Sequence, residues 1–412
     1  MKLTPKQKAV LSGKHGKGAA KAMEILAALG RIGGAPDLVP VGSVQVSGVS
    51  YNNIGEHGLA FLEDWAAMGS QAVAPATMNP GGSDRRIWKS LGFSSAFVRK
   101  QERVIKALEA LGIKPSLTCT PYHVGTTPKP GEHVAWAESS AVCFANSVLG
   151  ARTNREGGPS AIAAALTGFT PRHGLHTDEG RRPTRVVEVA CPVPTAADAG
   201  ALGYLIGRLL SSDKGGGIPF ITGTQPPAGA ERLTWLKALG AGMASAGSVG
   251  LYHLDCVTPE AAAQGSKLAK AAKARSVIRS LDEGRLALNR GEGKLDLVAV
   301  GCPHASPEDL TRILRLLNWK KAKVPFWIFT AEDVRRHAEE TGVAASLGRC
   351  GATLVADTCM VVAPLKELGI RVLATDSAKA AFYLPSHHGT RVYFGPLERN
   401  VEAALRGEWS ER

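Results

Sequence analysis

The sequence lacks closely paired cysteines, long apolar runs and an apolar segment near its start. None of its seven cysteines forms a Cys-x-x-Cys pair, which excludes the spacing of ferredoxin-type clusters and zinc ribbons. No apolar stretch is long enough, and free enough of glycine and charge, to span a bilayer. The segment Met1–Lys6 has no apolar core of a signal peptide. We therefore expect a cytoplasmic location, free thiols and no membrane partner.

Aromatic residues are scarce as well, at 6% of the chain. The net charge is +13, but lysine and arginine are spread along the sequence, and no basic run alternates with stacking aromatics. Nucleic-acid binding is therefore not expected. A positive potential of this kind instead favours a small anionic substrate or an acidic partner subunit.

The length of 412 residues suggests two or three domains. Strand-like and helix-like segments alternate along the chain, which is typical of parallel α/β units. We expect an α/β region at residues 1–212, a Gly- and Pro-rich connection at 213–230 and a second α/β region at 231–412. The pattern also predicts a strand at 114–119 and a Lys- and Ala-rich helix at about 260–283.

Three cysteines, Cys119, Cys302 and Cys359, lie at or just after apolar, strand-like runs that stop at Gly, Pro or Thr. Loops after strands are where α/β folds place their chemistry. Three converging thiolates suit an iron–sulfur cluster in which one iron has no protein ligand, and such an iron binds a substrate hydroxyl as a Lewis acid. The alternative is core packing, since free cysteine is often buried. We expect core packing for Cys191 and Cys256.

In residues 131–160, amide, hydroxyl and arginine side chains are interspersed with small residues. A solvated helix would favour Lys and Glu pairs instead. The pattern is typical of a site where the backbone approaches a ligand, with arginine available to bind carboxylate or phosphate. A buried polar network that only supports the fold is the alternative.

Polar residues in these loops and near a predicted helix start at Ala378 are the candidate contacts. Some are candidates to orient substrate or bound water, and we treat them as the catalytic set: Ser47, Ser50, Glu138, Ser139 and Asn154. Others are candidates for substrate binding: Asn79, Arg152, Arg155, Ser377 and Lys379. The alternative for Lys379 is that it is an ordinary exposed lysine on a helix. His123 and His133 are weaker candidates for metal binding or acid–base catalysis.

The segment Trp136–Ser160 resembles the signature of the aconitase X family, a branch of the aconitase superfamily. So do four shorter motifs that contain the residues discussed above: Val46–Tyr51, Thr118–Tyr122, Gly301–His304 and Asp357–Met360. The resemblance runs along nearly the whole chain. It implies an aconitase-like fold of parallel-sheet α/β units that form two to three domains around a central cleft, and a dehydratase with an iron centre.

The resemblance also implies a cofactor and a partner. The cofactor would be a [4Fe-4S] cluster held by Cys119, Cys302 and Cys359, with one open iron. The partner would be a separate small swivelling-domain subunit that forms a heterodimer with this chain. In the superfamily that domain carries the proton-abstracting serine, so we assign no general base to this chain.

Two activities are known in the family. One dehydrates mevalonate 5-phosphate to trans-anhydromevalonate 5-phosphate in the mevalonate pathway of isoprenoid biosynthesis, and the other dehydrates cis-3-hydroxy-L-proline. The positive charge and the expected separate subunit favour the phosphate ester. A non-enzymatic, metal-binding subunit is a further alternative.

Overall fold

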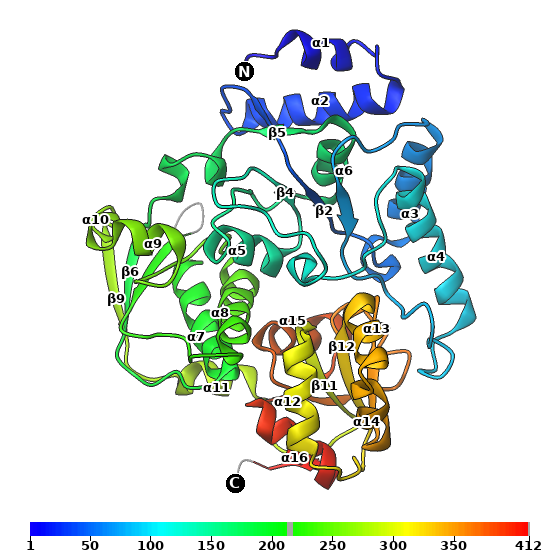
Figure 1. The fold of residues 1–412 in the computed structure, drawn as a ribbon, viewed down its shortest axis with the longest axis vertical. Coiled ribbons are helices and arrows are strands. Elements are labelled where there is room, and N and C mark those ends of the chain that lie inside the picture. Colours follow the sequence, from blue (N-terminus) through cyan, green and yellow to red (C-terminus); the bar gives the residue numbers. More distant parts are fainter. Residues whose placement is uncertain (212–216, 411–412) are drawn as a thin grey trace.

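Three parallel sheets, one in each successive part of the chain, organise the fold (Figure 1). The computed structural model describes residues 1–211 and 217–410. The prediction of an α/β fold built from several parallel-sheet units is confirmed. Of the predicted connection at 213–230, residues 213–216 lie outside the described residues, and residues 219–222 form a strand of the second sheet.

The first region carries the parallel sheet β3-β2-β4 and a small antiparallel pair, β1-β5. Helix α2 packs on α6, and α3 packs on α4. The elements of this region are α1 (Pro5–Leu11), α2 (Lys17–Ile32), β1 (Leu38–Pro40), β2 (Val44–Val46), α3 (Tyr51–Ala67), β3 (Ala76–Met78), α4 (Ser95–Ala110), η1 (Pro121–His123), β4 (Ala135–Trp136), α5 (Ser139–Ser147), α6 (Gly158–Thr167), β5 (Phe169–Pro171), η2 (Gly174–His176) and η3 (Glu179–Arg181).

The second region carries the parallel sheet β8-β7-β6-β9, with the paired helices α7 and α8 lying between it and the third region (Figure 1). Its elements are β6 (Arg185–Val189), α7 (Ala196–Leu210), β7 (Pro219–Thr222), α8 (Glu231–Gly247), β8 (His253–Leu254), α9 (Pro259–Gln264), α10 (Ser266–Ala269), β9 (Ala274–Ile278) and α11 (Asp282–Leu288).

The third region carries the parallel sheet β13-β12-β11-β14-β15 and an antiparallel pair, β10-β16. Its strands are rich in buried Val, Ile, Leu and Phe because helices cover both faces of the sheet. Its elements are β10 (Gly293–Lys294), β11 (Leu297–Ala305), α12 (Pro307–Leu317), β12 (Phe326–Thr330), α13 (Glu332–Glu340), α14 (Val343–Arg349), β13 (Ala352–Val355), β14 (Val372–Thr375), α15 (Ala378–His388), β15 (Arg391–Phe394), α16 (Leu397–Arg406) and β16 (Glu408–Trp409).

Two predicted elements are wrong. Residues 260–283 do not form one helix, because α9 ends at Gln264 and the next residue, Gly265, has a φ of 49°. Further along, β9 joins β6 as an added parallel strand. Residues 114–119 form no strand beyond a single bridge between Thr77 and Lys114. Pro115 has no amide hydrogen to donate, and Leu117 has a φ of 45°, so the alternation that a strand needs is lost.

The carboxyl ends of two of these sheets supply the segments that carry the candidate site residues. Strand β4 of the first region leads to Glu138, while β13 and β14 of the third region lead to Cys359 and Lys379. Cys302 lies in the second half of β11. Because parallel strands end at one edge of a sheet, these segments are brought together there.

Helices α7 and α8 of the second region approach each other through glycines. A Cβ atom added at Gly203 would lie 2.3 Å from the carbonyl oxygen of Leu239, so no side chain fits there. Both helices contact α15 of the third region, and α8 also contacts β11. The small residues of this helix pair therefore help to position the site.

We expect Gly203→Ala to destabilise the chain by about 1–3 kcal/mol, because the added methyl group overpacks the α7–α8 contact. The matched control is Gly348→Ala in α14, where an added Cβ meets nothing within 4 Å. That variant should gain roughly 0.5–1 kcal/mol. Denaturant unfolding measures both, and equal stabilities for the two variants would contradict the packing argument.

Candidate active site

Cys119 and Cys359 lie in loops, and Cys302 lies in the second half of β11. Cys119 and Cys359 are buried, and Cys302 is half-buried. Cys256 is exposed, so the prediction of core packing is wrong for this residue. Residue 304, two positions after Cys302, links the other two segments: its amide donates to Cys119 Sγ at 3.3 Å, and its ring Nε2 lies 2.9 Å from the carbonyl oxygen of Thr358, the residue before Cys359. The segments that carry the three cysteines are therefore neighbours in the structure, and metal binding by their thiols stays a prediction.

The three sulfur atoms lie in a buried environment that supplies hydrogen bonds and one positive charge. Burial raises the pKa of all three thiols, to about 12 for Cys302, while the Lys379 ammonium acts in the opposite direction on each. The backbone amide of His304 donates to the sulfur of Cys119 at 3.3 Å. The Ser377 hydroxyl lowers the pKa of Cys302, and the backbone amides of Val361 and Val362 lower the pKa of Cys359. Such donors stabilise negative charge on sulfur.

Glu138 and Lys379 form a buried ion pair beside the three cysteines. Glu138 caps the start of α5, where one carboxylate oxygen accepts hydrogen bonds from the Ala141 amide and the Ser140 hydroxyl, both at 2.6 Å. Burial disfavours the carboxylate, but the Lys379 charge and these hydrogen bonds outweigh it, so the pKa of Glu138 is lowered. Although burial alone would lower the pKa of Lys379, Glu138 and the thiols raise it. Both groups are therefore charged at neutral pH.

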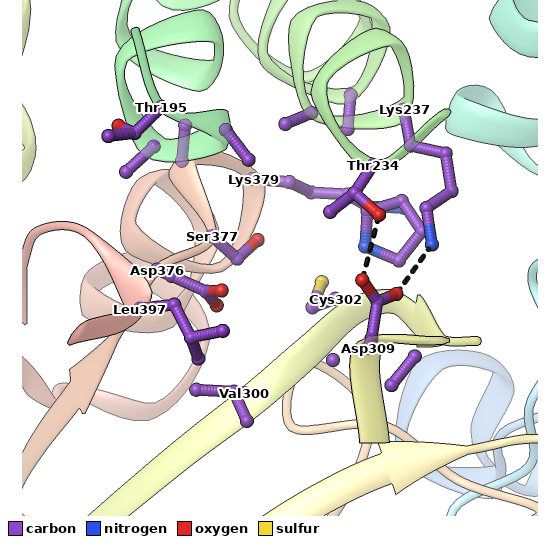
Figure 2. Close-up of a pocket in the computed structure, with 18 of the residues that line it drawn as sticks. Thr195, Thr234, Lys237, Val300, Cys302, Asp309, Asp376, Ser377, Lys379 and Leu397 are labelled. Carbon is purple, nitrogen blue, oxygen red and sulfur yellow. Dashed lines mark hydrogen bonds and ion pairs between the residues drawn. The ribbon is translucent and has the colours of Figure 1, made fainter. Parts of the chain in front are cut away.

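A small cavity borders this cluster on the side of the second region (Figure 2). Its volume is about 60 Å³, and its lining includes Cys302, Ser377 and Lys379. In Figure 2 the carboxylate of Asp309 accepts hydrogen bonds from Thr234 at 2.8 Å and from Lys237 at 3.3 Å. Ligand pockets usually measure about 300–1,000 Å³, so this cavity has room for water but not for a substrate.

Buried polar atoms without partners lie next to Cys359. Within residues 1–211 and 217–410, Asn79 Oδ1, Ser83 Oγ and Thr358 Oγ1 have no hydrogen-bond partner. Gly81 pairs with Thr358 in an isolated bridge, which places the Asn79–Ser83 segment against the loop of Cys359. Unsatisfied buried groups of this kind usually bind water, an ion or a ligand.

The predicted serines occupy different positions around the cluster. Ser50 is buried, and its hydroxyl donates to the carbonyl of Val362 at 3.3 Å, close to Cys359. Ser139 lies beside Glu138, to which it donates a hydrogen bond at 3.4 Å. Ser377 caps the start of α15. Ser47 is half-buried, and its carbonyl lies against the start of α6 at Gly158.

Three other predicted residues lie on the loop between α5 and α6. Arg152 forms an ion pair with Asp178 and lines a surface groove that shares no residue with the cavity beside Cys302. Asn154 holds the turn before η2 through hydrogen bonds with the carbonyl of His173 and the amide of Leu175. Arg155 is exposed. The structure therefore does not bring Arg152 or Asn154 to the cysteines.

Three residues near the cluster were not predicted as site residues: the buried His304 and Lys237 and the half-buried Asp309. The ring of His304 is fully buried among the cysteine loops, and burial lowers the pKa of His304 to about 4. Lys237 and Asp309 form an ion pair across the cavity. His304 stood in a motif next to Cys302, but Lys237 has the sequence context of an ordinary helix lysine. Only the tertiary contacts reveal it.

No three His, Cys, Asp or Glu side chains in the described part of the chain are gathered closely enough for a single metal ion. A single tetrahedral ion, with bonds of about 2.3 Å to sulfur, would require a tighter group than these thiols form. Among the same residues, no helix combines the length and apolar character needed to cross a bilayer.

Models of three aconitase X domains match the chain in order: the first domain at residues 1–179, the second at 183–284 and the third at 295–406. Together they span most of the sequence. The chain belongs to the aconitase X family. The structure also resembles the crystal structure of the holo form of aconitase X from Thermococcus kodakaraensis, with a TM-score of 0.88 and 38% sequence identity. The match covers 98% of this chain and 100% of the other.

Relatives in this family are named dehydratases. The phosphomevalonate dehydratase large subunit of Methanothermobacter thermautotrophicus is 44% identical over 92% of each chain. That of Thermococcus kodakarensis is 41% identical over 98% of this chain and 100% of the relative. The cis-3-hydroxy-L-proline dehydratase of Pseudomonas aeruginosa is 37% identical over 97% of this chain and 69% of its own length. This chain is therefore a hydro-lyase.

The Glu138–Lys379 pair makes a prediction for stability. In the metal-free chain, Lys379→Met should cost about 3–5 kcal/mol at pH 7, because it leaves a buried carboxylate unpaired. Since the folded pKa of Glu138 is lowered, the pair contributes stability above the unfolded pKa of about 4.5, and this contribution is lost as the pH falls through the folded pKa. The cost of the substitution should therefore shrink in acid. Denaturant unfolding between pH 3 and pH 7 measures it.

The control is Lys21→Met, which removes the lysine of an exposed pair with Glu24. Its cost should stay below about 1 kcal/mol. A second variant, Glu138→Gln combined with Lys379→Met, should recover most of the lost stability at neutral pH. If Lys379→Met cost no more than Lys21→Met, the buried pair would not have the energetic role assigned to it.

Proposed function

We propose that this chain is the large, iron–sulfur subunit of a hydro-lyase that converts mevalonate 5-phosphate to trans-anhydromevalonate 5-phosphate. The observation that carries the proposal is the convergence of three thiols beside a buried ion pair. The names of the relatives supply the substrate. Phosphomevalonate dehydratase large subunits reach 44% identity, whereas the hydroxyproline enzymes reach 37%.

The cofactor in this proposal is a [4Fe-4S] cluster held by Cys119, Cys302 and Cys359. The donor set fits such a group, because its sulfurs accept hydrogen bonds from the chain and lie beside a fixed positive charge. When bound, the cluster supplies an open iron that acts as a Lewis acid toward the leaving hydroxyl. The raised pKa values of the thiols mean that metal binding must displace their protons.

The residues around the cluster bind and orient substrate in this proposal. Lys379 and the Ser377 hydroxyl lie where an anionic group beside the cysteines would bind. Asn79 offers a buried oxygen that has no partner in the described part of the chain. Glu138 stays ionised and holds Lys379, Ser139 and Ser140 in place. Ser47 and Ser50 are further candidates to orient substrate.

The arginines need a different assignment. Arg152 is paired with Asp178, and Asn154 is engaged in a turn, so both support their loop. Arg155 is exposed and is the one member of this predicted group that we keep as a contact for substrate phosphate or for the partner subunit.

The partner in this proposal is a small swivelling-domain subunit. Relatives are named large subunits, a term that implies a small one. The cavity beside Cys302 is too small for the substrate, so this cavity alone is not the complete substrate site. A complete site needs a further surface. We infer that the small subunit provides this surface and also the general base.

The test is turnover of both candidate substrates by the chain co-expressed with its small subunit and purified anaerobically. Mevalonate 5-phosphate should be dehydrated, cis-3-hydroxy-L-proline should not, and the chain alone should be inactive. Arg155→Ala should cost about 1.5–3 kcal/mol of transition-state stabilisation, mainly as a higher KM, as expected for a lost hydrogen bond to a charged group.

Arg371→Ala is the matched control, because this exposed arginine precedes β14 and so lies at the end of the sheet opposite the site. Its kinetics should equal those of the unaltered enzyme. Efficient turnover of cis-3-hydroxy-L-proline, with none of the phosphate ester, would replace our proposal with the alternative. Full activity of the chain alone would remove the small subunit from it.

A further inference from the structure

His304 lies in β11, the segment that carries Cys302, and its ring contacts the two loops that carry Cys119 and Cys359. Its Nδ1 lies 3.0 Å from the hydroxyl of Thr118, the residue before Cys119. Its Nε2 lies 2.9 Å from the carbonyl oxygen of Thr358, the residue before Cys359. His304 itself follows Cys302 by two positions. These contacts join segments that are 186 and 54 residues apart in the sequence.

The partners fix which nitrogen carries the hydrogen. The Thr358 carbonyl can only accept, so Nε2 must be the donor. In a neutral ring Nδ1 is then an acceptor, and the Thr118 hydroxyl donates to it. The same hydroxyl oxygen accepts from the Thr120 amide at 3.1 Å. Every polar atom in this chain of contacts therefore has a consistent role.

His304 also contacts a sulfur atom directly through its backbone. Its amide donates to Cys119 Sγ at 3.3 Å. Thr118 and Cys119 belong to the first region, whereas Cys302, His304 and Cys359 belong to the third. The two hydrogen bonds from residue 304 to the 118–119 segment therefore cross from one region to the other. They oppose any separation of Cys119 from the other two cysteines.

We infer that His304 is a positioning residue that holds the three cysteine-bearing segments in the arrangement that receives the metal group. Both ring nitrogens are occupied by threonines, so neither is free to bind iron or to exchange a proton with substrate. The role of His304 is to fix loop geometry, and it rests on the proposed function only in naming what the three thiols bind.

Two pairs of variants test this inference on the full-length, metal-free chain. His304→Ala removes both ring contacts, and His253→Ala is its control. His253 is also buried, and its Nε2 lies 2.8 Å from the backbone carbonyl oxygen of Arg181. It lies in β8 of the second region, away from the cysteines. Thr118→Val removes only the hydroxyl that donates to the ring, while Thr118→Ser keeps it.

The first measurement is the rate at which iodoacetamide alkylates each cysteine, followed by mass spectrometry. His304→Ala and Thr118→Val should accelerate alkylation of Cys119 and Cys359 by about tenfold or more, as for the loss of a buried hydrogen bond. His253→Ala and Thr118→Ser should keep the original rates at these cysteines. Should His304→Ala fail to fold, the Thr118 pair decides the question alone.

The second measurement is iron content and visible absorption after anaerobic reconstitution. The His304→Ala and Thr118→Val chains should take up less iron than their controls. Unchanged alkylation rates together with normal iron uptake would overturn the role of His304 while leaving the proposed function intact. A third outcome is that the variants are alkylated faster but the unaltered chain itself binds no iron. That outcome would support the role of His304 in loop geometry and would refute the cluster.

Discussion

The Lys379 ammonium is buried beside one carboxylate and three thiols, and the chemistry of the site depends on this single positive charge. A buried anion without a partner is costly. Lys379 makes the Glu138 carboxylate tolerable and opposes the rise in pKa of each thiol. With Glu138 ionised in the interior, the segments that deliver these groups pack stably because the Lys379 ammonium neutralises that carboxylate.

Local structure places the groups around that charge with little freedom. Glu138 is anchored by the first turn of α5, and Lys379 stands in the first turn of α15 behind its cap, Ser377. Helix α8, which is closely packed on α7 through glycines, contacts α15 from the side of the second region. The site is thus assembled from all three regions, so a rigid packing between regions matters as much as the identity of the ligands.

Much of the fold and part of the site could be predicted from the sequence. Strand–loop–helix alternation indicated the parallel sheets, and the contexts of Cys119, Cys302 and Cys359 indicated their convergence, because both are local patterns. Arg152 and Asn154 were chosen for residue type in a polar segment, which cannot tell a site contact from a loop support. Lys237 and the ring contacts of His304 depend on neighbours far away in the sequence, and no local pattern encodes them.

The central claim is that these three cysteines, and not the other four, bind the metal group. The most direct measurement is iron per chain after anaerobic reconstitution of Cys119→Ala, Cys302→Ala and Cys359→Ala, with the exposed Cys256→Ala and the fully buried Cys350→Ala as controls. The unaltered chain and both controls should hold about three to four irons, as expected for a cluster with cysteine ligands, and the three variants almost none. Normal iron content in any of the three would contradict the account.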